Sequence, residues 1–93
     1  MTLVAILTVP RDAEPQYRAY EAKAERIMAR HGGAIERVIE VEAETPDTFR
    51  EVHIVRFPDD AAFAAYRADP EIVASAPERS AAILQTQILR AKH

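Results

Sequence analysis

A histidine in the middle of an apolar stretch is the residue best suited to acid–base chemistry in this chain. The stretch "REVHIVRFP" places His53 on the same side as Glu51 and Val55 and opposite to Arg56. Because imidazole titrates near neutral pH, His53 is the candidate general base or ligand-orienting residue. A neutral, hydrogen-bonded core histidine would show the same pattern, and the sequence leaves that alternative open.

Three tyrosines are candidate ligand-binding residues. Tyr17, Tyr20 and Tyr66 fall on the apolar sides of two predicted helices, where their hydroxyls would meet a phenolic or carbonyl ligand in a small apolar cavity. Aromatic residues at helical spacing also form ordinary cores, so packing is the alternative.

A metal site is not expected. The chain has no cysteine, and its three histidines show no H-x-H or H-x-x-x-H spacing, so ligands would have to be gathered from separate segments. His31, beside the glycines, is expected to interact favourably with the negative, C-terminal end of the helix dipole rather than to bind a ligand. We expect no metal and no cofactor.

The order of the predicted elements gives the fold. Short apolar runs predict strands, and apolar residues spaced by three and four predict helices. The predicted elements are strand 2–9, helix 14–30, strand 34–42, strand 49–58, helix 60–68, short helical turns at 70–82 broken by Pro77, and strand 83–91. This β-α-β-β-α-β order predicts an α+β, ferredoxin-like domain with a four-stranded antiparallel sheet.

Two features of the individual elements can be tested. Gly32 and Gly33, the only glycines, follow the last periodic residue of the first helix and are expected to end it, because a left-handed residue is needed there. They do not cradle a phosphate, which would need glycines before a helix. In strand 34–42, regular alternation puts Ile35, Ile39 and Val41 on one face.

Composition limits the class of protein. The chain of 93 residues is one domain, 1–93, with a net charge of -3, which favours neither nucleic acid nor an anionic membrane as a partner. No apolar run is long enough to span a membrane, and the N-terminal stretch lacks the features of a secretory signal. We expect a cytoplasmic protein.

Three features together resemble a known family. They are "YEAKAERIMARHGG", "REVHIVRFPDDAAFAAYRADPE" and Arg79. They are similar to a small uncharacterised bacterial family of the dimeric α/β-barrel superfamily, kin to antibiotic-biosynthesis monooxygenases and to EthD-like and NIPSNAP-like proteins. The resemblance covers most of the chain and implies a homodimer in which two sheets meet face to face. It also marks Arg79, which matches a family arginine, as a carboxylate- or enolate-binding candidate; an ion pair with Glu71 or another acid is the alternative.

Other proteins with this order of elements fit less well. RNA-recognition domains carry glycine and stacking aromatic residues in the third strand, which "REVHIVRF" lacks. Acylphosphatases need an asparagine and a phosphate-binding loop, whereas this chain has no asparagine and "PRDAEP" has no glycine.

Two functions remain open from the sequence. The first is a cofactor-independent enzyme of the monooxygenase, isomerase or cyclase type, acting on a small apolar or aromatic acid. In it His53 or a tyrosine removes a proton and an arginine holds the anion. The second is a non-catalytic ligand-binding or assembly dimer. The apolar strands, with no spare helix to cover their second face, favour a homodimer in both cases.

Overall fold

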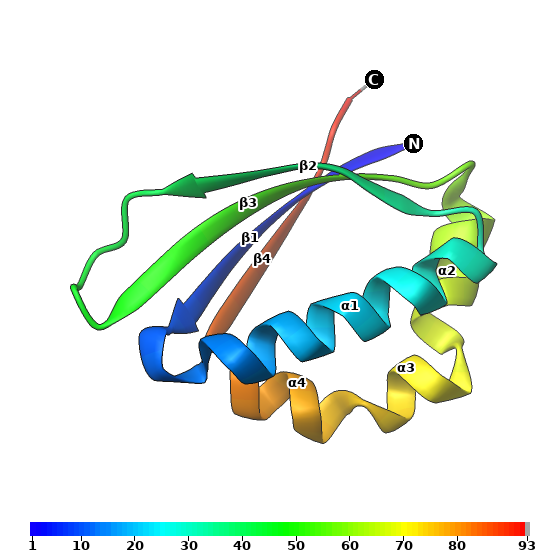
Figure 1. Ribbon diagram of the computed structural model, residues 1–93. Coiled ribbons are helices and arrows are strands. Elements are labelled where there is room, and N and C mark those ends of the chain that lie inside the picture. Colours follow the sequence, from blue (N-terminus) through cyan, green and yellow to red (C-terminus); the bar gives the residue numbers. More distant parts are fainter. Residues whose placement is uncertain (93) are drawn as a thin grey trace.

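The computed structural model describes residues 1–92, in which one four-stranded antiparallel sheet carries all the helices on a single face (Figure 1). The elements are β1 (Thr2–Pro10), the 3-10 turn η1 (Arg11–Ala13), α1 (Glu14–Arg30), β2 (Ala34–Val41), β3 (Thr48–Arg56), α2 (Asp60–Ala68), α3 (Pro70–Ala74), α4 (Ala76–Ala82) and β4 (Gln85–Arg90). The predicted α+β, ferredoxin-like fold is confirmed.

The sheet places the candidate histidine at its centre. The strand order is β2-β3-β1-β4, with every neighbouring pair antiparallel. His53 of β3 lies opposite Ala5 of β1 and opposite Val38 of β2. Its imidazole therefore projects from a strand that is paired on both edges.

The two central strands alternate between a covered face and an open face. On the helix-covered face, the buried residues of β1 and β3 are Leu3, Leu7, Val9, Phe49, Glu51, His53 and Val55. On the open face, the half-buried aliphatic residues are Val4, Ile6, Val52 and Ile54. No helix of residues 1–92 covers this second face (Figure 1).

Helix α1 supplies most of the cover for the sheet. It begins at Glu14 with Pro15 in its first turn, where the missing N–H of proline breaks no helical bond. Its buried side chains follow the predicted stripe: Tyr17, Tyr20, Ala24, Ile27 and Met28. The stripe lies on the sheet and turns both tyrosines toward the interior.

The two glycines end α1 as predicted, and glycine is required at each position for a different physical reason. Gly32 has a φ of 75°, and its N–H donates to the carbonyl of Ala29, while the N–H of Gly33 donates to that of Met28. This pair of bonds is a Schellman motif. A Cβ on Gly33 would lie 2.4 Å from Phe57 Cε1, so Gly33 is required by close packing rather than by its backbone angles.

The regular alternation predicted for the second strand is wrong. A β-bulge between Ile35 and Arg37 shifts the register, so the side chains before and after it point to opposite faces. Ile35 lies opposite Val55 on the covered face, whereas Ile39 lies opposite Val52 on the open face. The aliphatic side chains of this strand therefore serve two different surfaces.

The helical segment after α2 also differs in detail from its prediction. Pro77 lies in the first turn of α4 instead of breaking a helix, and the break between α3 and α4 falls at Ser75. Asp59 caps α2 as predicted, with its carboxylate accepting the N–H of Ala62 at 2.8 Å. The final strand is shorter than predicted because it begins at Gln85.

Candidate functional site

A buried polar cluster joins α1 to the middle of β3. The hydroxyl of Tyr17 lies 2.7 Å from Glu51 Oε1 and 3.1 Å from His53 Nε2. His53 Nε2 is also 3.0 Å from Glu51 Oε1, and Arg18 Nη1 is 2.8 Å from Glu51 Oε2. The helical stripe and the strand alternation thus bring residues more than thirty positions apart into one network, in which His53 is 4% exposed.

The protons of this cluster can be assigned from its charges. Burial opposes the ionisation of Glu51, but the hydrogen bonds it accepts outweigh burial and hold its pKa below the usual range. An ionised carboxylate only accepts, so the Nε2–H of His53 and the hydroxyl of Tyr17 donate to it. When the imidazole is neutral, its one N–H is at Nε2, and Nδ1 of His53 keeps a free lone pair.

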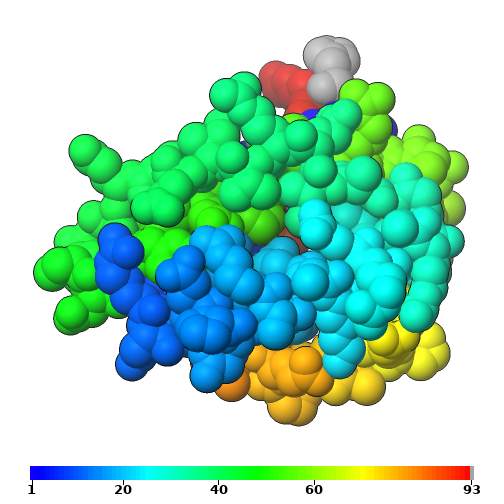
Figure 2. Space-filling model, viewed as in Figure 1, coloured from blue at the N-terminus to red at the C-terminus, as the bar shows by residue number. Residues whose placement is uncertain are grey.

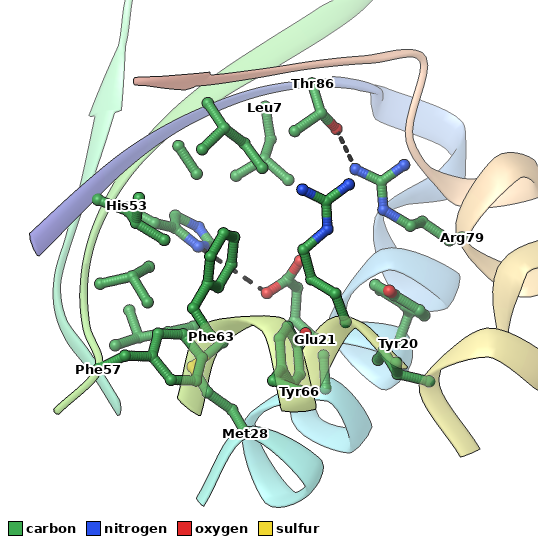
Figure 3. Close-up of a pocket in the computed structure, with 18 of the residues that line it drawn as sticks. Leu7, Tyr20, Glu21, Met28, His53, Phe57, Phe63, Tyr66, Arg79 and Thr86 are labelled. Carbon is green, nitrogen blue, oxygen red and sulfur yellow. Dashed lines mark hydrogen bonds and ion pairs between the residues drawn. The ribbon is translucent and has the colours of Figure 1, made fainter. Parts of the chain in front are cut away.

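A second carboxylate faces that lone pair. Glu21 Oε2 of α1 lies 3.8 Å from His53 Nδ1 (Figure 3). Burial raises the pKa of Glu21, against the opposing effect of the nearby His53. The imidazole therefore stands between a carboxylate that is readily ionised, Glu51, and one that holds a proton more firmly, Glu21.

His53 and Glu21 both line a cavity of about 460 Å³ between the helices and the sheet. The buried core consists of two separate clusters, and the cavity lies between them, because both contribute to its walls. The apolar part of its lining includes Leu3, Leu7, Met28, Val55, Phe57 and Phe63. A volume of this size holds a small aromatic molecule.

The cavity opens near β4. Val73 of α3 and Ile88 of β4 line it, yet they are 58% and 49% exposed. Lining residues that are also exposed mark an entrance, and this entrance is apolar. A ligand that enters here passes two aliphatic side chains before it reaches His53.

A positively charged group lies across the cavity from the imidazole. Arg79 of α4 donates from Nη2 to Thr86 Oγ1 at 2.5 Å, and both residues line the cavity (Figure 3). Within residues 1–92, Arg79 forms no ion pair; Glu71, the alternative partner, pairs with Arg30 at 2.7 Å instead. Arg79 is thus available to an anionic ligand.

The structure separates the candidate tyrosines into two roles. Tyr20 and Tyr66 line the cavity with His53 and Arg79, and burial raises the pKa of both hydroxyls. Tyr17 is not among the lining residues; it lies behind His53 with its hydroxyl on Glu51. Tyr17 can therefore orient the imidazole without touching a ligand.

Sequence reasoning missed the two carboxylates and one hydroxyl of the site. Glu51 was visible as the residue two positions before His53 on the same strand face, and Glu21 follows Tyr17 by one helical turn. These spacings could have identified both. Thr86 gave no such signal, because only the pairing of β4 with β1 brings it to the cavity.

The structure shows neither a metal-binding cluster nor a membrane-spanning helix among residues 1–92. Among residues 1–92, no group of three or more histidine, aspartate or glutamate side chains is arranged to hold a metal ion. No helix in the same part of the chain is long and apolar enough to cross a membrane.

Solved structures with the same fold include proteins of the predicted kin. SnoaB, a cofactor-independent oxygenase from Streptomyces nogalater, is 20% identical (99% of this chain, 92% of that chain, TM-score 0.64). A candidate antibiotic biosynthesis monooxygenase from Bacteroides thetaiotaomicron is 17% identical (100% and 88%, TM-score 0.68). An uncharacterised NIPSNAP domain protein from Burkholderia xenovorans is 17% identical (96% and 93%, TM-score 0.61). At these identities the likeness concerns the fold.

The family follows from the sequence itself. A comparison with curated proteins gives no match. The family model "Domain of unknown function (DUF1330)" matches residues 3–91, nearly the whole chain. The expected membership in a family of unknown function is confirmed: the chain belongs to the DUF1330 family.

Proposed function

We propose that this protein is an enzyme in which His53 removes a proton from a small aromatic or apolar acid bound in the cavity. One observation carries the proposal: His53 lines a largely apolar cavity while its Nε2 lies 3.0 Å from the buried Glu51 carboxylate. With Nε2–H donating to Glu51, Nδ1 of the neutral imidazole can accept a proton. Such an imidazole is a general base with a fixed tautomer.

The other cavity residues support the same reaction. The carboxylate of the ligand would bind the guanidinium of Arg79, and its apolar body would lie against Met28 and Phe57. The proton would pass to Nδ1 of His53, and the resulting imidazolium would be stabilised by the buried carboxylate of Glu51. The negative charge that forms on the ligand would be held by Arg79.

The likeness to SnoaB supports an enzyme that works without a cofactor. SnoaB is a cofactor-independent oxygenase, and removal of a proton to give an enolate or phenolate can precede reaction with O₂. The same first step also begins isomerisation and cyclisation. We therefore assign to this chain the shared step, proton abstraction, followed by one of these three outcomes.

Hydrogen exchange on an aromatic keto acid tests the proposal. Phenylpyruvate combines an aromatic ring, a carboxylate and acidic C–H bonds beside a ketone. We expect the protein to accelerate exchange of its C3 hydrogens in D₂O, followed by ¹H NMR against a protein-free control. His53→Phe should reduce the protein-dependent rate by about 100-fold or more, as for loss of a positioned base.

A matched control uses another histidine. His31 bonds to Asp69 at 2.8 Å and does not line the cavity, so His31→Gln should retain the exchange. If wild-type protein is stabilised by phenylpyruvate but exchanges no hydrogen, the non-catalytic ligand-binding alternative is correct. If His53→Phe exchanges as fast as wild type, His53 is not the base.

We also propose that the protein is a homodimer formed through the open face of the sheet. Ile39 and Leu89 are 37% and 47% exposed on this face, beside the half-buried Val52 and Ile54. A continuous aliphatic surface of this kind favours contact with a second copy. On the same face, Arg50 Nε is buried without a hydrogen-bond partner in residues 1–92, and a second chain could supply the acceptor.

A further inference from the structure

A second, smaller hollow reaches the same imidazole from another side. It measures about 200 Å³ and is formed by α1, β2 and β3. Its lining includes Arg18, Glu25 and Val38 together with Glu21 and His53. In Figure 2 the seam between α1, in blue to cyan, and the green strand residues above it faces the viewer.

Among residues 1–92, three line both hollows: His53, Glu21 and Ile35. The His53–Glu21 pair therefore separates the large cavity from the groove between α1 and β2. The Glu21 side chain is 17% exposed, whereas that of His53 is 5% exposed. Of the two titratable residues, Glu21 is thus the one with access to solvent.

We propose that Glu21 relays the proton between His53 and solvent through the groove between α1 and β2. This inference rests on the proposed function, because it concerns the proton that His53 removes. The proton moves from the ligand to Nδ1 of His53, then from Nδ1 to Oε2 of Glu21, and then to water in the groove. Each transfer leaves the donor with its electron pair, so His53 and Glu21 return to their starting states.

The geometry favours this direction over the alternatives. Nε2 of His53 bonds to Glu51, which also lines the groove, but the side chain of Glu51 is only 5% exposed and its lowered pKa makes it the poorer proton acceptor. The 3.8 Å between Nδ1 and Glu21 Oε2 is an ion-pair distance that a small side-chain rotation shortens to a hydrogen bond. Burial raises the pKa of Glu21, which brings its proton affinity closer to that of an imidazole.

The charged groups around the pair come from α1, β3 and α4. Around His53, α1 contributes Tyr17 and Glu21, and β3 contributes Glu51. Besides burial, Glu51 and Glu25 raise the pKa of Glu21, whereas Arg79 of α4 lowers it. The opposite positions on β1 and β2 are the apolar Ala5 and Val38. Nothing else on the neighbouring strands competes for Nδ1 in the part of the chain described.

Deuterium exchange of phenylpyruvate separates the relay from the base. Without a relay, the removed proton returns to the ligand before it can be replaced by solvent deuterium. Glu21→Gln, which keeps the shape of the side chain, should lower the exchange rate about 100-fold, while phenylpyruvate, an anion, binds at least as tightly as it does to wild type. Imidazole buffer, which can enter the groove, should restore exchange in this variant and leave wild type unaffected.

Two variants serve as controls. Glu25 lines the groove but not the cavity, so Glu25→Gln should exchange as wild type does. Glu21→Asp keeps a carboxylate and should retain more exchange than Glu21→Gln. Full exchange in Glu21→Gln, or a loss that buffer does not restore, overturns the relay; His53→Phe then still decides the proposed function.

A measurement without ligand covers the case in which the wild type exchanges nothing. The relay requires that Glu21 and His53 interact, and His53 lowers the pKa of Glu21 against the effect of burial. His53→Phe should therefore raise the pH at the midpoint of the Glu21 carboxyl titration, followed by ¹³C NMR. An unchanged midpoint overturns the relay whether or not phenylpyruvate is a substrate.

Discussion

The two faces of the sheet are built from the same strands but differ in chemistry. On β3, Glu51 and His53 point toward the helices and are almost fully buried, whereas Val52 and Ile54 between them point to the open face. The covered face buries charge in a hydrogen-bonded network beside a cavity, and the open face presents only aliphatic side chains at its centre. A strand with period two can therefore hold a candidate active site and a candidate interface at adjacent residues.

The largest effect is expected from a charge on the open face. Ile54→Lys would place an ammonium group in the proposed interface, where it has no partner. We expect the dimer to weaken by about 100-fold or more, which is about 2.8 kcal/mol, so that light scattering at micromolar concentration gives the mass of one chain. Ala65→Lys, on an exposed position of α2, should keep the dimer. A wild-type mass of one chain would show that the open face is not a dimer interface.

The next effect concerns the charge buried on the covered face. Glu51→Gln keeps the shape of the side chain but removes the charge that accepts three hydrogen bonds. We expect a loss of about 1.5 to 3 kcal/mol in the free energy of unfolding at pH 7, the usual value of a hydrogen bond to a charged group. Urea unfolding of both proteins measures it.

The stability differences of Glu51→Gln and Glu21→Gln should have opposite signs and should both depend on pH. The pKa of Glu51 is lowered in the folded state, so its stabilisation is present above the unfolded value of about 4.3 and is lost as the pH falls through the folded value. The pKa of Glu21 is raised, so Glu21→Gln should instead stabilise the protein at pH 7. The Glu21 difference from wild type should shrink as the pH falls toward about 4.3, whereas the Glu51 difference should shrink only below that pH; a constant difference would contradict these assignments.

Much of the covered face could be predicted from local spacing. The buried side of α1 and the shared face of Glu51 and His53 follow from periods of 3.6 and two. The partners could not be predicted, because the contact from Tyr17 to His53 spans 36 positions and depends on how α1 is rotated over the sheet. The arrangement in which Tyr17 lies behind the imidazole while Tyr20 lines the cavity is likewise a tertiary feature.

The open face was harder to predict because of one bulge. An extra residue between Ile35 and Arg37 leaves the composition of the strand unchanged but reverses the faces of all the residues that follow. Ile39 therefore joins the open face, while Ile35 lines the cavity. The sequence contains no glycine or proline there to indicate the irregularity.

Substitution of the two glycines compares side-chain packing on the covered face, at Gly33, with a local backbone effect, at Gly32. Gly33→Ala would force its Cβ to 2.4 Å from the Phe57 ring, and overpacking of this kind costs about 1 to 3 kcal/mol. Gly32→Ala places a Cβ on a left-handed residue, at a cost of about 1 to 2 kcal/mol. Thermal unfolding measures both. The prediction fails if Gly33→Ala is harmless, since Phe57 would then yield easily.

The smallest effect compares one hydroxyl on each face. Tyr17→Phe removes a buried hydroxyl that donates to Glu51 at 2.7 Å, and we expect a loss of about 0.5 to 1.5 kcal/mol in the free energy of unfolding. Thr8 points to the open face, and its hydroxyl makes no hydrogen bond within residues 1–92. Thr8→Val should therefore change the stability by less than about 0.5 kcal/mol. Urea unfolding at pH 7 compares the two variants, and equal losses would mean that the open face also depends on polar contacts.

Tyr17→Phe should also affect the proposed reaction, because Tyr17 contacts His53 without lining the cavity. We expect this variant to slow phenylpyruvate exchange more than it weakens phenylpyruvate binding. Thr8→Val should alter neither the exchange rate nor the binding.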